Sequence, residues 1–162
     1  MTDYSQRVHK VGTPPGTLLY VGKRKLQTPR ITLVRYSPDE VTEAQVTAEE
    51  ACAPPAPGTV TWINVEGLHE VEVVRVLGES FGLDRLVMED ILDTGHRPKV
   101  EEYGHYLYVV GRYFWYDDAA DELHSEQISL ILAPGLLMTF CEGGWDILAP
   151  IRERLRQATS RL

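Results

Sequence analysis

The sequence predicts a single α/β (α+β) domain with a mixed, mostly antiparallel β-sheet covered by helices. The patterns along the chain run in the order strands, helices, strands and a last helix, which is typical of this class. A length of 162 residues suits one domain with a sizeable core. The composition, with 43% hydrophobic and 25% charged residues, is that of a globular protein.

The amino-terminal part is expected to contain an arm and two strands. Residues 1–16, which end in Pro-Pro-Gly, are predicted to form a flexible arm, and residues 17–162 the domain. Thr17–Gly22 and Arg30–Tyr36 are predicted strands on either side of the basic turn Lys23-Arg24-Lys25. We interpret this turn as solvated, with a contact to lipid headgroups or a place beside a pore as the alternative.

A connecting region precedes the next strand. Ser37 and Pro38 predict a short helix or turn, because serine caps helices and proline suits the first helical position. Thr47–Ala51 predicts a second short helix, which the proline-rich loop 54–58 ends. Val60–Val65 is an apolar-rich run that predicts a buried strand.

Two helices are expected in the middle of the chain. His69–Phe81 has apolar side chains at helical spacing, and Gly82 ends the pattern. Asp84–Asp93 predicts the second helix. Val100–Tyr116 is rich in Tyr, Val and Phe, which predicts one or two long strands.

The last part of the chain predicts a hairpin and a helix. Ser125–Leu132 and Leu136–Cys141 flank a Pro-Gly turn and read as the two hairpin strands. Pro150–Leu162 predicts a helix whose apolar stripe still runs at the last residue, so it is either a native end that frays or a truncated longer helix. The stripe consists of Leu148, Ile151, Leu155, Ala158 and Leu162.

Charge and cysteine usage disfavour several functional classes. The net charge is −8, and residues 39–126 hold twenty acidic against five basic side chains, whereas a nucleic-acid binder needs a basic surplus. Cys52 and Cys141 are too far apart in sequence for a zinc knuckle or a disulfide framework. We see no signal peptide, no membrane-spanning stretch and no complete catalytic motif, and we expect a soluble chain that is not an enzyme.

The predicted helix Asp84–Asp93 carries the most chemistry. At about 100 degrees per residue, Asp90 falls inside an apolar arc, and Glu89 and Asp93 lie side by side on its edge. The arc consists of Leu86, Val87 and Ile91. An unpaired carboxylate on an apolar face near the carboxyl end of a helix is unfavourable, so a counter-charge is predicted.

Three interpretations of this helix stay open. Arg97 or Lys99 can neutralise the helix end, since both are close in sequence. A divalent cation such as Mg²⁺, which prefers carboxylate oxygen, can bind at an interface with another chain. A catalytic pair of Glu89 and Asp90 is the third interpretation, although no second motif completes an acid–base site.

An ordered set of segments resembles the cytoplasmic amino-terminal domain of CorA-type magnesium and cobalt transporters. The resemblance covers about residues 13–157. Its segments are Pro14-Pro15-Gly16-Thr17-Leu18, Thr61-Trp62-Ile63-Asn64-Val65, Phe81-Gly82-Leu83, Leu86-Val87-Met88-Glu89-Asp90-Ile91-Leu92, Arg97-Pro98-Lys99-Val100-Glu101, Ser125-Glu126-Gln127-Ile128-Ser129 and Arg152-Glu153-Arg154-Leu155-Arg156.

The resemblance implies a mixed sheet sandwiched between helices, on the cytosolic face of the inner membrane. It implies a homopentamer in the full-length protein, in which divalent ions bind between neighbouring domains and favour the closed pore. Asp90 matches the family's key acidic residue, and Glu89 lies beside it. The partner carboxylate would come from a stalk helix of the neighbouring protomer, beyond Leu162, as would the membrane helices.

We therefore expect a regulatory, metal-sensing domain of a Mg²⁺ or Co²⁺ channel-like transporter, with metal ligands Asp90 and Glu89. The expected ion is Mg²⁺, with Co²⁺ or Zn²⁺ as alternatives, bound weakly by the isolated domain. The same domain of a zinc-transporting relative is one alternative function, and a stand-alone soluble interaction module is another. A nucleic-acid partner is not expected, and the membrane is met only through the missing carboxyl-terminal part.

Overall fold

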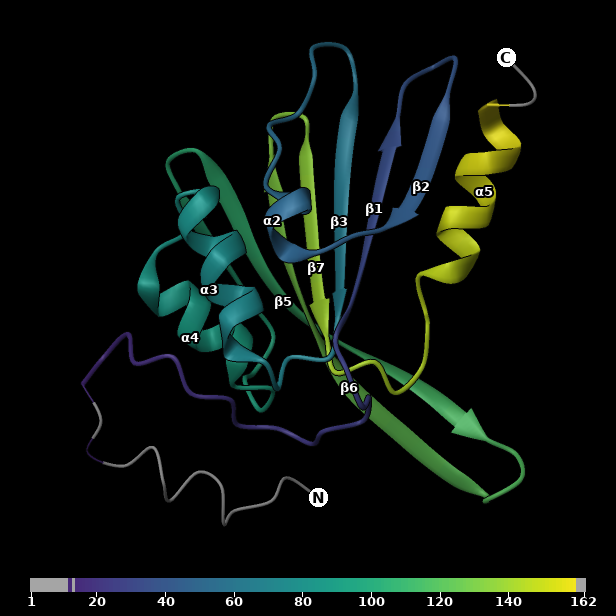
Figure 1. The fold of residues 1–162 in the computed structure, drawn as a ribbon. Coiled ribbons are helices and arrows are strands. Elements are labelled where there is room, and N and C mark those ends of the chain that lie inside the picture. Colours follow the sequence, from purple (N-terminus) through teal and green to yellow (C-terminus); the bar gives the residue numbers. More distant parts are fainter. Residues whose placement is uncertain (1–11, 13, 160–162) are drawn as a thin grey trace.

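The computed structural model, which describes residue 12 and residues 14–159, contains a seven-stranded mixed sheet in the order β2-β1-β3-β7-β6-β5-β4 (Figure 1). The strands are β1 Arg30–Tyr36, β2 Val41–Gln45, β3 Val60–Glu66, β4 Lys99–Tyr103, β5 Tyr106–Asp117, β6 Glu122–Ala133 and β7 Leu136–Cys141. The helices are α2 Ala48–Ala51, α3 Val71–Ser80, α4 Arg85–Leu92 and α5 Ala149–Thr159. Within this sheet β3 and β7 pair in parallel and the other neighbouring strands pair antiparallel, so the predicted α/β class with a mostly antiparallel sheet is confirmed.

Helices cover both faces of the sheet. Figure 1 shows α2, α3 and α4 on one face and α5 beside β2 on the other. The larger core lies under the first group and joins residues such as Leu77 of α3, Ile91 of α4 and Phe140 of β7. A smaller core under α5 contains Trp62 and Leu148. The position of α4 on the larger core decides which of its side chains reach the surface.

Most predicted elements are confirmed, and two segments differ. Thr17–Gly22 is not a strand: only Val21 forms an isolated bridge, to Asp93 at the end of α4. The backbone bonds of this segment run to α4 rather than to the sheet, since Val21 N–H donates to Leu92 O and Thr94 N–H donates to Val21 O. Strand β2 was not predicted, because its exposed Val-Thr-Glu-Ala-Gln sequence lacks an apolar alternation.

The hairpin formed by β5 and β6 projects beyond the rest of the sheet, at the lower right of Figure 1. Strand β4 pairs with β5 only up to Val110, and β7 pairs with β6 only from Ile128 onward. Residues 111–117 and 122–127 therefore pair mainly with each other. We call this segment the projecting hairpin.

The predicted stripe of the last helix is only partly correct. Leu148 is buried, but Ile151 is exposed and the neighbouring Arg152 is buried instead. Arg152 lies at ion-pair distance from Asp146 and from Glu43 of β2, which explains why a charged side chain replaces an apolar one against the sheet. Residues 160–162 and the predicted arm up to residue 11 lie outside the described part. Within that part, no helix is both long and apolar enough to cross a bilayer.

Candidate functional site

Helix α4 is fixed at both ends by its flanking aspartates. The Asp84 side chain accepts a hydrogen bond from Leu86 N–H at 2.8 Å, which satisfies one of the free donors of the first turn. The Asp84 N–H donates in turn to the Tyr106 hydroxyl at 3.0 Å. Asp93 ends the helix in an extended conformation. These contacts hold α4 against β5 and set its rotation.

That rotation corrects the predicted apolar arc. The buried side consists of Val87, Met88, Ile91 and Leu92, whereas Leu86 is 50% exposed. At about 100 degrees per residue, the centre of the buried side lies away from Asp90. Asp90 is consequently at the edge of the core rather than inside it, and its side chain is 20% exposed.

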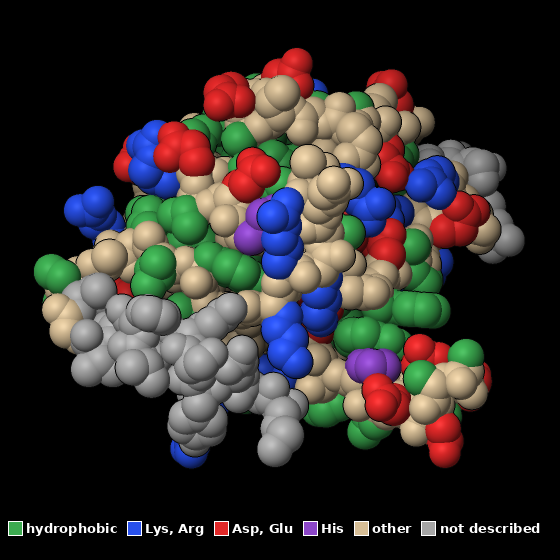
Figure 2. Space-filling model, turned by 60° about the horizontal axis from the view of Figure 1, so that its bottom comes forward, with side chains coloured by type: hydrophobic (Ala, Val, Ile, Leu, Met, Phe, Trp, Pro, Cys, Tyr) green, Lys and Arg blue, Asp and Glu red, His purple; other side chains and the backbone are tan. Residues whose placement is uncertain are grey.

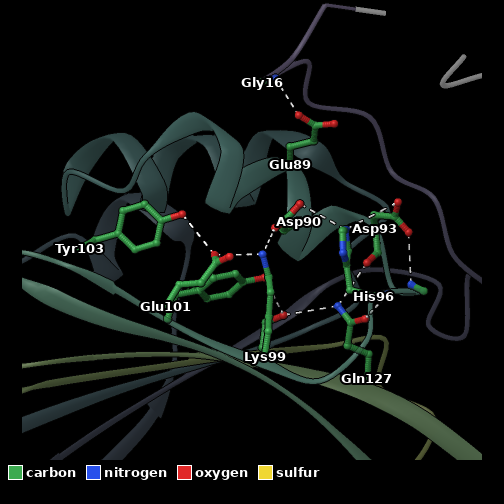
Figure 3. Close-up of polar contacts among 12 residues, drawn as sticks. Gly16, Glu89, Asp90, Asp93, His96, Lys99, Glu101, Tyr103 and Gln127 are labelled. Carbon is green, nitrogen blue, oxygen red and sulfur yellow. Dashed lines mark hydrogen bonds and ion pairs between the residues drawn. The ribbon is translucent and has the colours of Figure 1, made fainter. Parts of the chain in front are cut away.

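Asp90 is paired within its own chain. Its Oδ2 accepts a 2.6 Å hydrogen bond from Lys99 Nζ, and its Oδ1 lies 3.2 Å from His96 Nε2 (Figure 3). Lys99 Nζ also donates to Glu101 Oε2 at 2.9 Å. Of the two basic partners that the sequence suggested, Lys99 reaches Asp90, whereas Arg97 is exposed.

The ion pair changes the proton affinity of both partners. Partial burial acts to raise the pKa of Asp90, but the interactions with His96 and Lys99 outweigh it, so this pKa lies below its ordinary value. Burial likewise acts to lower the pKa of Lys99, and its hydrogen bonds to Asp90 and Glu101 raise it overall. Both groups are therefore charged at neutral pH.

Glu89 and Asp90 do not converge on one point. In Figure 3, Glu89 is turned towards Gly16, and Asp90 is turned towards His96 and Lys99. Glu89 Oε2 accepts a 2.6 Å hydrogen bond from Gly16 N–H. Gly16 has a φ of +79°, a conformation that glycine adopts without strain, and this conformation belongs to the turn that presents its N–H to Glu89.

Several carboxylates lie close together around α4 in the described part of the chain. The cluster that we call the α4 acidic face consists of Glu89, Asp90, Asp93 and Glu101, with Lys99 as the ammonium that pairs with two of them. His96, also 3.8 Å from Asp93 Oδ2, adds charge only when it is protonated. Oxygen ligands of this kind suit a hard cation. The described residues nevertheless hold no group of three His, Cys, Asp or Glu side chains that could hold a metal by themselves.

Three residues of this region were not predicted from the sequence. His96 and Gln127 meet through a 2.9 Å hydrogen bond from the His96 N–H to the Gln127 Oε1, and Gln127 Nε2 donates to Asp93 O. Glu101 lies two residues after Lys99 on β4 and so shares its side of the strand. The strand periodicity was a usable signal for Glu101, but the path of the loop after Asp93 was needed to place His96.

A second acidic cluster, centred on Lys25, shows that the basic turn is not simply solvated. Lys25 Nζ lies 2.8 Å from Glu126 Oε2 and 3.7 Å from Glu142 Oε2. Glu126 also accepts hydrogen bonds from the backbone N–H groups of Gly143 and Gly144. We call this group the Lys25 cluster. Its donors satisfy carboxylates that are almost fully buried.

The chain resembles characterised transport proteins. A family model described as "CorA-like Mg2+ transporter protein" matches residues 57–162. The cobalt/magnesium transport protein CorA of Thermotoga maritima is 43% identical over 148 residues, which cover 91% of this chain and 42% of that protein. The chain thus spans less than half the length of this relative.

Solved structures share the fold. The full-length CmaX protein superposes with a TM-score of 0.64 at 15% identity, over 85% of this chain and 41% of the other. The complete CorA magnesium transporter from Methanocaldococcus jannaschii superposes with a TM-score of 0.56 at 14% identity, over 80% and 38% of the two chains. These likenesses establish the architecture. The family-model match to residues 57–162 and the 43% identity show that this chain belongs to the family of CorA-like magnesium transporter proteins.

Proposed function

We propose that this chain is the regulatory, metal-sensing domain of a divalent-cation transporter that carries Mg²⁺ or Co²⁺. Membership of the family supports a transport role, and the relative from Thermotoga maritima is named for cobalt and magnesium transport. Pore, membrane helices and transport would belong to a longer protein, on whose cytosolic side this domain would lie. The observation that carries the sensing role is the position of Asp90 at the edge of the core, where its carboxylate is 20% exposed.

The α4 acidic face would supply half of an ion site. Glu89 and Asp90 would face a carboxylate from the stalk helix of a neighbouring protomer in a homopentamer. An ion bound between two protomers would favour the closed arrangement by its higher affinity for that arrangement. When the ion leaves, the facing carboxylates repel one another and the subunits loosen.

Lys99 would act as the internal competitor of the ion. Its ammonium already occupies Asp90 Oδ2, so an ion must displace it or bind Asp90 through ordered water. Mg²⁺ sheds its hydration shell reluctantly, which favours the second route. The consequence is a site of low affinity, as a sensor of a cation that is present at high concentration requires.

Limited proteolysis of the complete protein, with and without Mg²⁺, tests this proposal. We expect Mg²⁺ to protect the parent protein, and Asp90→Ala to remove most of that protection. Asp118→Ala, which removes an exposed carboxylate from the tip of the projecting hairpin, is the matched control and should keep it. Unchanged protection in Asp90→Ala would refute the sensing role.

The 162-residue chain alone gives a second test. One or two carboxylates with water make a poor cage, so we expect a Kd for Mg²⁺ of roughly millimolar or weaker. Isothermal titration calorimetry measures it directly. Micromolar affinity in the isolated chain would contradict a site that is shared between protomers.

Zn²⁺ as the cargo or sensed ion is a second candidate, which His96 favours. Imidazole suits Zn²⁺ better than Mg²⁺, and His96 Nε2 lies 3.2 Å from Asp90 Oδ1. Transport of Zn²⁺ but not Mg²⁺ by the complete protein would support this candidate. If a His96→Gln variant keeps its protection from proteolysis by Mg²⁺, the result would support Mg²⁺ as the sensed ion instead.

A further inference from the structure

A cavity of about 340 Å³ lies at the base of the projecting hairpin, and Thr94 and Gln127 are part of its lining. One wall comes from the segment around Lys23, and the other comes from β5 and β6. Its lining residues are Val21, Gly22, Lys23, Lys25, Thr94, Arg112, Trp115, Leu123, His124, Ser125, Glu126, Gln127 and Glu142. This volume falls in the range of small-molecule sites.

Two basic side chains of this cavity have no acidic partner among the described residues. Arg112 is held by neutral acceptors, since it donates to Thr94 O and to Ser125 Oγ, each at 3.2 Å. A guanidinium has five N–H donors, so Arg112 keeps capacity for a further acceptor. The Lys23 side chain is exposed and contributes a second positive charge to the opening.

The acidic residues of the cavity are already satisfied by the protein. Glu126 accepts from Lys25 and from two backbone N–H groups. Glu142 Oε1 accepts from the Tyr20 hydroxyl, the Lys23 N–H and the Thr94 hydroxyl. The charged side chains of the lining are the three bases Lys23, Lys25 and Arg112 and the two acids Glu126 and Glu142, so the cavity carries a net charge of +1 with His124 neutral. Figure 2 shows Lys and Arg side chains gathered in a band beside the projecting hairpin, on a chain that is acidic overall.

Aromatic surface adjoins these cations. Trp115 is half-buried and lies in a stacked row with His124 at 5.2 Å and Tyr113 at 5.5 Å between ring centroids. Leu123, on the neighbouring strand, is 69% exposed and also lines the cavity. The row of rings suits a planar group beside it.

We propose that this cavity binds a phosphorylated ligand with a planar ring, of the nucleoside monophosphate class. The phosphate meets Lys23 and Arg112 in charge-assisted hydrogen bonds, which for arginine and phosphate are among the stronger ones in proteins. The ring lies against Leu123 and against the part of Trp115 that Lys25, whose Nζ lies over the indole 5.4 Å from its centroid, leaves open. This site shares no metal ligand with the α4 acidic face and does not depend on the proposed function.

Titration calorimetry of the 162-residue chain with AMP, ribose 5-phosphate and inorganic phosphate tests the proposal. We expect AMP to bind more tightly than ribose 5-phosphate, because only AMP carries the ring. Lys23→Gln and Arg112→Gln should each weaken AMP binding about tenfold, as loss of a hydrogen bond to a charged group does. Trp115→Leu should remove the preference for AMP over ribose 5-phosphate.

Arg154→Gln is the matched control, since it removes one exposed positive charge far along the chain on α5. It should leave AMP binding unchanged. An equal loss of AMP affinity in Arg154→Gln would mean that the overall charge of the chain, and not this cavity, determines binding, and it would overturn the proposal. Because Lys23 is exposed, its variant should fold even if Arg112→Gln does not.

Vesicles that contain phosphatidylglycerol distinguish a lipid headgroup from a free ligand. We expect the chain not to sediment with them at physiological salt. Sedimentation that Lys23→Gln abolishes, without any AMP binding, would assign the basic wall to a lipid surface and overturn the nucleotide proposal. Absence of AMP binding at millimolar concentration would overturn it as well.

Discussion

The Lys25 cluster and the α4 acidic face both contain carboxylates paired with a lysine, but Glu126 of the first is buried and Asp90 of the second is partly exposed. Each places carboxylates around one lysine. In the Lys25 cluster, Glu126 is fully buried and two backbone N–H groups complete its hydrogen bonds. On the α4 acidic face, Asp90 is 20% exposed and shares its lysine with Glu101.

The difference shows what separates a structural ion pair from a candidate binding site. Buried carboxylates must be satisfied by the fold, because each unpaired charge in the interior is strongly unfavourable. Partly exposed carboxylates such as Asp90 and Glu101 stay accessible to a cation from the solvent. Residue type alone therefore does not identify the site, and the exposure of the carboxylates is needed as well.

The largest effect on stability is expected from a substitution that breaks the Lys25 cluster. Lys25→Met leaves Glu126 buried without its ammonium, and we expect a loss of about 3 kcal/mol in the free energy of unfolding. Urea denaturation measures it. Lys23→Met, which changes an exposed neighbour, should cost less than about 0.5 kcal/mol. Similar losses of unfolding free energy in both variants would mean that the pair of Lys25 and Glu126 does not stabilise the fold.

A smaller effect on stability is expected from Lys99→Met. The variant removes one partner of a half-buried pair, so we expect a loss of about 1 kcal/mol. Because the ammonium competes with a cation for Asp90, the affinity for Mg²⁺ should rise several-fold, which calorimetry can detect. A lower or unchanged affinity would show that Lys99 does not compete with the ion.

The pH dependence of Asp90 gives the third prediction. Since folding lowers the pKa of Asp90, its contribution is fully present above the pKa of the unfolded carboxyl, about 3.9, and is lost as the pH falls through the lowered value. The stability difference between the parent chain and Asp90→Asn should be at most about 1 kcal/mol at pH 7. It should vanish near pH 2 in urea titrations. A difference that persists there would have another origin.

The smallest effect is expected from Glu101→Gln. Its side chain is 40% exposed, so we expect a change below about 0.5 kcal/mol in unfolding free energy. The affinity for Mg²⁺ should fall by less than twofold, because one carboxylate of the α4 acidic face is lost. A loss of unfolding free energy above about 1 kcal/mol would show that the ion pair of Glu101 with Lys99 stabilises the fold.

The sequence predicted the elements whose patterns are strong and local. Val60–Val65 and Leu136–Cys141 were found because both segments are rich in apolar residues, as buried strands are. The exposed edge strand β2 has no such pattern. The Val21 segment was misassigned because its β-branched composition suits a strand, although its backbone bonds run to the end of α4.

The candidate site was predictable in part. The placement of Asp90 on a predicted apolar face, near the carboxyl end of its helix, indicated a counter-charge, and Lys99 was one of the partners considered. The apolar arc was placed wrongly, because a single helical period does not show which side meets the core. The pair of Lys25 and Glu126 joins residues 101 positions apart, and only the folded topology brings them together.

The parallel pairing of β3 with β7 has a consequence for synthesis. Strand β3 is an interior strand between β1 and β7, and the hydrogen bond between Asn64 and Thr139 joins residues 75 positions apart. While the ribosome is still making residues 67–135, one side of β3 has no partner, and such an unpaired apolar edge is prone to aggregate. The nascent chain therefore gains its finished sheet only when residues 136–141 have left the exit tunnel.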